Sequence, residues 1–340
     1  EGVDEEDFVF ILGYPGRTYR HSTSYYMAFE EDVRMPFVVD YYGWQIRMME
    51  ETAKDDRSIA LLHLSRIKGL SNTMKNYQGK LLGMKRLGLV EKKREEEAAL
   101  RRFIESDPER MKKYGTLLDE IGAVYEKRRQ TAASDVIYNY LRRSSTPLSI
   151  AYTLVQASIE RKKPDLERDS GFMERNWPRT RQSMLLGLNM YYEPTDKKLF
   201  RDMLERASRL DPRIPALVPV IGPDKHEAAI DAFIGRAYPE SRLTDPEVLD
   251  GILEDPVEKV PGLKDPFVDL ARALYPVYEA RREEERVVQG RMDELESRLL
   301  DVKQAFMERS FIPDANGTLR LTFGRIRGYT PVDGVYYNPI

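Results

Sequence analysis

The residues best suited to contacting a ligand lie in one polar stretch, residues 71–80, SNTMKNYQGK, within an otherwise apolar helical pattern. Asn72 and Asn76 stand inside this stretch, although asparagine is a poor helix former because its amide competes for backbone hydrogen bonds. One interpretation is a solvent-exposed helix face. The other is a binding face, because an asparagine carbonyl can accept a hydrogen bond from a ligand ammonium while its amide donates to a carbonyl. Both interpretations stay open from the residues alone.

Other chemically active side chains are few and scattered. The three histidines, His21, His63 and His226, have neither a second histidine nor a metal-like pair of acids near them in sequence. We therefore predict structural roles for them, with no metal and no cofactor. Cysteine is absent, which excludes disulfides, thiol nucleophiles and cysteine-ligated metals. Neither a Gly-x-Ser-x-Gly nor a Gly-Asn-Ser-Gly motif occurs, so no serine hydrolase site can be assembled from recognisable signatures.

Two basic segments resemble an anion-binding turn and a basic patch. The turn at residues 13–17, GYPGR, has two glycines and an arginine, but a phosphate loop needs a helix starting directly behind it, near Thr18. A tight turn is therefore favoured. Arg320, Arg325 and Arg327 lie on a predicted strand, and we interpret them as a solvent-exposed edge. The 54 basic and 57 acidic residues give a net charge of −3, which favours neither nucleic acid nor an anionic membrane as partner.

The elements that would position these residues are mostly helices. Strand character is found only at residues 8–18, FVFILGYPGRT, and 318–326, where apolar residues alternate with Arg and Thr. The segments between them have apolar residues at helical spacings of three and four, and no apolar run approaches the roughly 20 residues that span a bilayer. The sequence therefore predicts a mainly α protein, in which a large helical body is inserted into a β framework.

Three of the predicted helices matter for the organisation: 58–82, 109–143 and 266–309. The apolar stripe of the first comprises Leu61, Leu62, Leu64, Ile67 and Leu70. The last has Pro276 as an expected kink and carries a heptad seam in its second half, made of Val288, Met292, Leu295, Leu299, Val302 and Phe306. This seam needs an antiparallel partner, for which the other two helices are the candidates. Shared apolar faces predict one helical domain rather than two.

Three blocks of the sequence resemble the bacterial dipeptidyl-peptidase 7/11 family of chymotrypsin-like serine exopeptidases. They are FVFILGYPGRT at 8–18, TMKNYQGKLLGMKRLGLVEKK at 73–93 and PDANGTLRLTFGRIRGYTPVDG at 313–334, in the family's order and at compatible spacing. The resemblance implies a double β-barrel peptidase with a helical domain inserted in its second barrel, where it caps the active-site cleft. Such enzymes remove dipeptides from the N-termini of peptides.

The resemblance also implies where the chemistry lies. In the family, the catalytic histidine and aspartate precede the GYPGRT-like strand and the serine follows the TLRLTFG-like strand. No triad residue can therefore be carried over to this chain, and alone it is expected to be inactive. A helical-domain asparagine helps to hold the substrate's free α-amino group; Asn76, in the Lys75-Asn76 pair, is the match, and Asn72 is the second choice. Fixing that ammonium would place the second peptide bond at the nucleophile.

The predicted organisation has three parts: a barrel strand segment at 1–20, a helical cap at 21–310 and a returning barrel segment at 311–340. The chain begins at Glu1 and shows no signal peptide, so we expect it to be cut from a longer periplasmic or secreted protein. Its expected partners are peptides with a free N-terminus, and a homodimer is a candidate assembly. The alternative is a non-enzymatic α-helical protein-interaction module. That alternative predicts an exposed apolar seam on the last helix, whereas the cap predicts a buried one.

Overall fold

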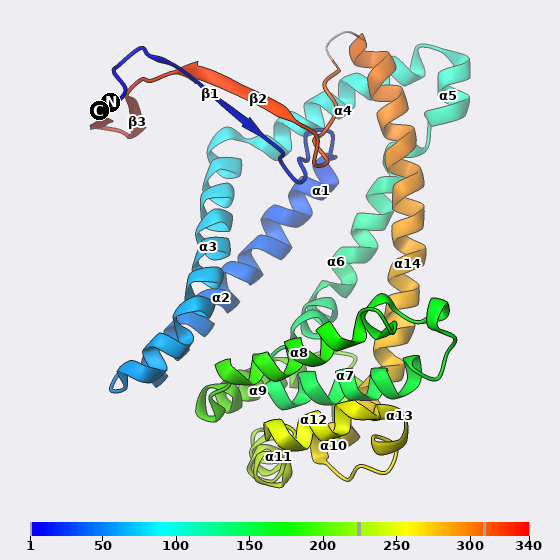
Figure 1. The fold of residues 1–340 in the computed structure, drawn as a ribbon. Coiled ribbons are helices and arrows are strands. Elements are labelled where there is room, and N and C mark those ends of the chain that lie inside the picture. The colour runs from blue at the N-terminus through cyan, green and yellow to red at the C-terminus, as the bar shows by residue number, and fades with distance from the viewer. Residues whose placement is uncertain (1, 223–225, 309–310, 340) are drawn as a thin grey trace. The chain divides into compact units, whose positions relative to one another are not determined.

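The computed structural model describes residues 2–222, 226–308 and 311–339, and the chain is mainly α, as predicted (Figure 1). The helices of the first half are α1 (Ser24–Phe29), the π-helix η1 (Glu30–Arg34), α2 (Met35–Thr52), α3 (Arg57–Leu87), α4 (Leu89–Glu105), α5 (Pro108–Tyr114), α6 (Leu117–Leu141) and α7 (Thr146–Glu160). Those of the second half are α8 (Trp177–Gly187), α9 (Glu193–Ser208), α10 (Val218–Ile221), α11 (His226–Glu240), α12 (Pro246–Glu254), α13 (Pro256–Lys259) and α14 (Pro266–Met307).

Short 3-10 helices and four strands complete the described chain. The 3-10 helices are η2 (Asp165–Glu167), η3 (Ser170–Phe172), η4 (Leu188–Met190) and η5 (Pro215–Leu217). The strands are β1 (Phe8–Gly13), β2 (Arg320–Arg325), β3 (Tyr329–Val332) and β4 (Val335–Tyr337). Within the described ranges, none of the helices combines the length and the apolar character needed to cross a membrane.

Capping explains where α3 begins and ends. Asp56 accepts hydrogen bonds from two backbone amides of the first turn, which satisfies donors that have no partner inside the helix. The helix ends at Leu87 and is capped by Gly88, whose φ of 58° is left-handed and suits glycine. α3 is therefore longer than the predicted 58–82, because the glycines in its interior keep a helical conformation.

The helix predicted over 109–143 is two helices, so the prediction of a single helix was wrong. α5 ends at Tyr114 and α6 begins at Leu117. Between them, the amide of Gly115 donates to the carbonyl of Met111, and a Cβ on Gly115 would lie only 2.6 Å from that carbonyl oxygen. Glycine thus fits the end of α5, where any other residue would force the Met111 carbonyl to shift.

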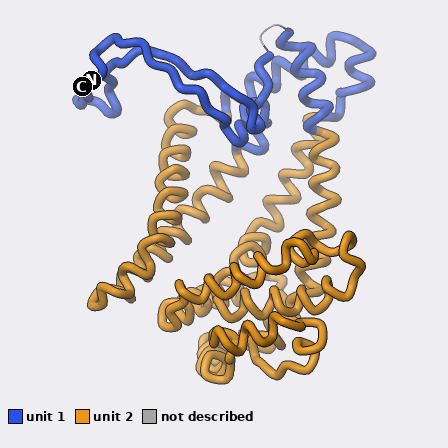
Figure 2. The backbone as a smooth tube through the Cα atoms, in the orientation of Figure 1, with its two compact units in different colours: residues 1–27, 91–117, 296–340 blue, residues 28–90, 118–295 orange. Residues whose placement is uncertain are grey.

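Contacts divide the chain into two compact units (Figure 2). Unit 1 comprises residues 1–27, 91–117 and 296–340, and unit 2 comprises residues 28–90 and 118–295. Unit 1 therefore holds the strands together with α4 and α5, whereas unit 2 holds most of the helices. The three-part division predicted from the sequence stays a prediction.

The two strands predicted near opposite ends of the chain pair with each other. β1 and β2 form an antiparallel ribbon in unit 1, with the first residue of β1 opposite the last residue of β2 (Figure 1). Successive side chains of a strand point to opposite faces, and the neighbours Ile11 and Leu12 are 70% and 59% exposed. Both faces of the ribbon are thus apolar and open. β3 and β4 form a separate antiparallel hairpin.

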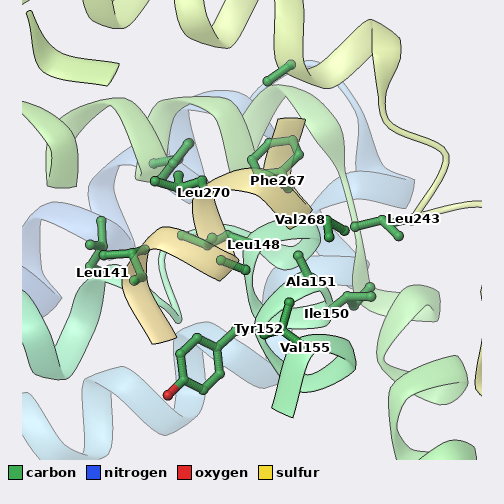
Figure 3. Packing of buried hydrophobic residues seen from close by; sticks show 14 of the residues in the cluster. Leu141, Leu148, Ile150, Ala151, Tyr152, Val155, Leu243, Phe267, Val268 and Leu270 are labelled. Carbon is green, nitrogen blue, oxygen red and sulfur yellow. The ribbon is translucent and has the colours of Figure 1, made fainter. Parts of the chain in front are cut away.

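The main hydrophobic core lies in unit 2 and is built around α7 (Figure 3). Leu148 and Ala151 of α7 are completely buried, as are Phe267 and Val268 from the first turn of α14. α7 is apolar around most of its circumference, which is typical of a helix enclosed by other helices. This helix is the most deeply embedded part of the fold.

α14 lies antiparallel to α6 within unit 2. The contacts run in opposite chain directions and comprise Arg291–Glu120, Glu285–Arg128, Arg281–Asp135 and Tyr278–Tyr138. Met292 and Leu295 of the heptad seam are 3% and 0% exposed, and Leu299 and Val302 are buried as well. The prediction of an antiparallel partner within 109–143 is confirmed. Val288 is half-buried and Phe306 is 38% exposed, so the centre of the seam is buried and its two ends are accessible. The buried centre speaks against the interaction module, which required an exposed seam. The kink at Pro276 stays a prediction.

Candidate functional site

The inner face of α3 packs against α2 along a heptad stripe that includes polar residues. Its buried or half-buried members are His63, Ile67, Leu70, Met74, Tyr77, Leu81 and Met84. Met74 fits against Gly43 of α2, where a Cβ would lie 3.4 Å from the methionine sulfur. Leu61 and Leu64, which the sequence analysis placed on the apolar face, are instead 60% and 43% exposed. The heptad register excludes them, because the stripe uses His63 where the sequence suggested leucines.

The opposite face of α3 carries both candidate asparagines. Asn72 and Asn76 are exposed and one helical turn apart, so their side chains leave the same side of the helix. In the described part of the chain, neither side chain makes a hydrogen bond. Three glycines continue this side at steps of three and four. We call the resulting set the outer stripe of α3: Gly69, Asn72, Asn76, Gly79 and Gly83.

Packing within the chain does not explain the glycines of the outer stripe. A Cβ at Gly69, Gly79 or Gly83 would meet nothing within 4 Å. Each glycine in a helix interior costs roughly 1 kcal/mol relative to alanine. Without side chains at these positions, a peptide backbone can approach α3 closely and reach Asn72 and Asn76. The spacing of these small residues is the sequence signal for this surface.

Charge and aromatic contacts anchor the inner side of α3 next to Asn76. Glu30 of η1 is buried and accepts two hydrogen bonds of 2.5 Å from the guanidinium of Arg34. The Arg34 Cζ lies 5.5 Å from the centre of the Tyr77 ring, and the Lys80 Nζ lies 5.6 Å from it. η1 is a π-helix, a form frequent at functional sites. The contacts therefore fix the backbone that carries Asn76.

Aromatic rings from α2 and α6 pack together behind this region. Tyr41 and Tyr42 of α2 each make an edge-on contact with Tyr140 of α6, at ring-centre distances of 5.1 and 6.2 Å. Burial raises the pKa of Tyr140 and of Tyr41, so both phenols stay neutral at ordinary pH. The cluster thus supports α2 and supplies no base at neutral pH.

His63 anchors the first half of α3 to α9. Its Nε2 lies 2.9 Å from the Oγ1 of Thr195, and both residues are buried. Burial lowers the pKa of His63, with a smaller contribution from the charge of Arg66, so the ring is neutral at pH 7. Beside Thr195, the buried carboxylate of Asp196 accepts a hydrogen bond of 2.5 Å from the hydroxyl of Tyr238. This buried network links α3 through α9 to α11 and gives His63 a structural contact.

The other two histidines face backbone carbonyls. The His21 Nε2 lies 2.8 Å from the carbonyl oxygen of Ile312, and the His226 Nδ1 lies 2.9 Å from that of Ile221. Among the described residues, no histidine ring is hydrogen-bonded to a serine or a carboxylate, and no cluster of three or more potential metal ligands is found. The residues described here therefore do not contain an assembled Ser-His-Asp arrangement.

The turn at residues 13–17 belongs to the ribbon and does not lead into a helix. The carbonyl of Pro15 accepts a hydrogen bond of 3.0 Å from the amide of Gly317. The next helix, α1, begins only at Ser24. A phosphate loop needs the N-terminus of a helix directly behind it, so the structure supports the tight turn and not the phosphate site.

Comparison with known proteins gives one family over the whole length. The sequence model of the family described as Peptidase S46 matches residues 1–340. An Asp/Glu-specific dipeptidyl-peptidase of Shewanella putrefaciens is 26% identical over 342 residues, which cover 100% of this chain and 46% of that protein. A dipeptidyl-peptidase 7 of Capnocytophaga gingivalis is 25% identical over 96% of this chain and 45% of its own length. The chain thus spans about half the length of the curated relatives it matches.

Solved structures of Porphyromonas endodontalis DPP11 share the fold. One crystal structure superposes with a TM-score of 0.72 over 99% of this chain and 48% of its own, at 19% identity. The same protein in complex with the dipeptide Arg-Glu gives the same TM-score, identity and coverage. In an alternate conformation it gives a TM-score of 0.53 at 17% identity, over 99% of this chain and 46% of its own. These likenesses show a common fold.

Proposed function

The chain belongs to the peptidase S46 family, and we propose that it is the helical cap of a serine dipeptidyl-peptidase, with flanking strands of the catalytic barrel. The intact enzyme would remove dipeptides from the N-termini of peptides. In this proposal the catalytic triad is supplied by parts of the peptidase outside this chain, which alone would be inactive. The names of the relatives as dipeptidyl-peptidases and the dipeptide bound to one of them support the substrate class. We place the enzyme in the periplasm or outside the cell.

The observation that carries the role of the helices is the outer stripe of α3. It presents Asn72 and Asn76 without competing partners in the described chain, on a helix surface otherwise made of glycines. A substrate's terminal ammonium that leaves water needs acceptors in its place. The carbonyl oxygen of Asn76 supplies one and that of Asn72 is the second candidate.

Holding the ammonium would also explain why dipeptides are released. If α3 fixes the first residue's amino group, the second peptide bond lies at a constant distance from that anchor and meets the nucleophile. The anchor must then be rigid. The contacts of Tyr77 with Arg34 and Lys80, directly beside Asn76, meet this requirement.

Substrate analogues test the assignment in the full-length peptidase. We expect Asn76→Ala to lower kcat/KM for a fluorogenic dipeptidyl substrate by about 10- to 100-fold, because hydrogen bonds to charged groups contribute about 1.5–3 kcal/mol. The same variant should leave unchanged the low rate on an analogue with hydrogen in place of the α-ammonium. Gln78→Ala is the matched control, because Gln78 is exposed on the same helix but lies off the outer stripe.

The outcomes separate the two asparagines. A loss with Asn72→Ala and none with Asn76→Ala would move the anchor to Asn72. If neither substitution changes kcat/KM for the ammonium substrate, α3 does not bind the substrate N-terminus and the proposed role is wrong. An equal loss on both substrates would show a general distortion of the cap rather than recognition of the ammonium.

The interaction module finds less support. Its long helix would dock a partner through the heptad seam, but Met292 and Leu295 are buried within the chain. A homodimer remains a proposal that sedimentation of the full-length protein can test. Peptides with a free N-terminus are the partners that we propose for the cap.

A further inference from the structure

Side chains from distant parts of unit 1 make hydrogen bonds to the backbone of the segment between the ribbon and α1. The carboxylate of Asp314 accepts hydrogen bonds from the Thr18 hydroxyl at 2.6 Å, the Arg20 amide at 2.7 Å and the His21 amide at 3.1 Å. Asp314 itself lies on the return path from α14 to β2. The segment that leads from the ribbon into the helices is thus hydrogen-bonded to the segment that leads from α14 back to the ribbon.

Two lysines donate hydrogen bonds to backbone carbonyls of the same segment. The Nζ of Lys93, from α4, donates to the Arg20 carbonyl at 2.9 Å, and the Nζ of Lys303, from α14, donates to the His21 carbonyl at 2.9 Å. Lys93 also pairs with Glu96. Lys303 differs from it, because it is only 8% exposed. Among the described residues, no carboxylate lies within ion-pairing distance of Lys303.

The acids nearest to Lys303 have other partners. Glu97 of α4 is buried and accepts hydrogen bonds from the Ser24 amide at 2.6 Å and the Ser24 hydroxyl at 2.5 Å, which starts α1. Asp314 is occupied by the amides and the hydroxyl described above. Lys303 is therefore a buried ammonium whose one hydrogen bond within the described chain goes to a backbone carbonyl.

Such a group works against folding. Burial lowers the pKa of Lys303 to about 8, and the charge of Lys93 acts in the same direction, whereas Glu97, Glu96 and Asp314 oppose it. The folded chain thus holds the charged form less favourably than water does. A methionine of similar length would remove this cost, since replacing a buried charge by an apolar group is often neutral or stabilising. Stability alone gives no reason for a lysine here.

We propose that Lys303 is a positioning residue, which fixes the His21 carbonyl so that the ribbon keeps one orientation relative to α4 and the end of α14. The carboxylates of Asp314 and Glu97 accept hydrogen bonds from backbone amides of residues 18–24, and Lys93 and Lys303 donate to backbone carbonyls of the same segment. We call this set of contacts the clamp. It joins residues almost 300 positions apart in sequence. The proposal concerns unit 1 only and does not depend on the proposed peptidase role.

Hydrogen exchange on the full chain tests the clamp. In Lys303→Met, we expect the backbone amides of Arg20, His21 and Ser24 to lose about tenfold in protection, the factor that corresponds to one hydrogen bond from a charged donor. The amides of α7, in unit 2, should keep their protection, and the melting temperature should stay unchanged or rise. Lys303→Arg should restore the protection because it retains a cationic donor. Lys93→Met should have a smaller effect, because the hydrogen bond from Lys93 to the neighbouring Arg20 carbonyl is exposed to solvent.

Three results would overturn the proposal. Unchanged protection at Arg20 and His21 in Lys303→Met would show that the ammonium does not hold the segment. A lower melting temperature with protection lost throughout α7, or a variant that does not fold, would show that Lys303 acts as an ordinary stabilising residue. Equal losses in Lys303→Arg and Lys303→Met would show that packing volume matters and the donor does not.

Discussion

The core helix α7 and the ribbon of β1 and β2 both carry large apolar side chains, yet these side chains end in opposite environments. Leu148 and Ala151 of α7 are fully buried by helices of the same unit (Figure 3). Phe10, Ile11 and Phe323 of the ribbon are mostly exposed on both faces of a two-stranded sheet. Isolated two-stranded sheets are marginally stable in water and need further strands or a covering layer. The difference shows that the helices of unit 2 bury their own core, whereas the described chain leaves the apolar faces of the ribbon uncovered.

The largest effect is expected in the core around α7, which is formed by residues of unit 2. Leu148→Ala removes a side chain that is fully buried, and such changes lower the free energy of unfolding by about 2–5 kcal/mol. Urea denaturation followed by circular dichroism measures it. A loss below about 1 kcal/mol would mean that this core is loosely packed, and would break the contrast with the ribbon.

A second effect comes from the charged group buried in unit 1. The pKa of Lys303 is about 8 in the folded chain, against an ordinary value of 10.5. Between these values the unfolded chain binds more protons, so the stability of the wild-type chain rises with pH relative to Lys303→Met. We expect a relative gain of about 2 kcal/mol between about pH 7 and pH 9.5, since each pKa unit corresponds to 1.36 kcal/mol. Urea titrations of both chains at the two pH values measure it. Curves that shift in parallel with pH would show that Lys303 has an ordinary pKa.

A third effect concerns the outer stripe of α3, whose glycines are not explained by packing within the described chain. Gly79→Ala should raise the free energy of unfolding of the chain by up to about 1 kcal/mol, because the new Cβ meets open space in a helix. Gly290→Ala in α14 is the matched control, since a Cβ there also meets nothing within 4 Å. In the full-length peptidase, only Gly79→Ala should lower kcat/KM, by obstructing the approach of the substrate. Equal activity in both variants would show that nothing approaches this face closely.

The smallest effect is expected in the ribbon. Leu12→Ala should change the stability of the chain by less than about 0.5 kcal/mol, the range of ordinary surface substitutions. In the full-length protein the same substitution should be several times more destabilising if other strands cover this face. Thermal unfolding of both proteins compares the two. A large loss in the chain alone would indicate that the ribbon is already packed, for example against a second copy.

Local patterns predicted the helical class, the long last helix and the two strands, because each depends on residues close in sequence. The inner face of α3 was predicted in part: Ile67 and Leu70 lie on it, but Leu61 and Leu64 do not. His63 and Tyr77 complete the face, and their polar groups hide them in a pattern of apolar residues. The close approach of Gly115 to the Met111 carbonyl, at the end of α5, is a contact that the sequence does not reveal. Asn72 and Asn76 were proposed from their residue types, and the helix places both on one exposed side; their role stays a prediction. The clamp around Lys303 joins segments too distant for any local pattern to connect.

The pairing of β1 with β2 has a topological consequence. Gly13 lies opposite Arg320 at the end of the ribbon from which the helices leave and to which they return. The entire helical body is therefore the loop of a single β-hairpin, about 300 residues long. Each doubling of loop length adds only about 0.6 kcal/mol to the entropy of closure, so a sheet tolerates such a loop if the loop folds on its own. A short turn linking Gly13 to Arg320 is therefore expected to leave the hairpin register intact.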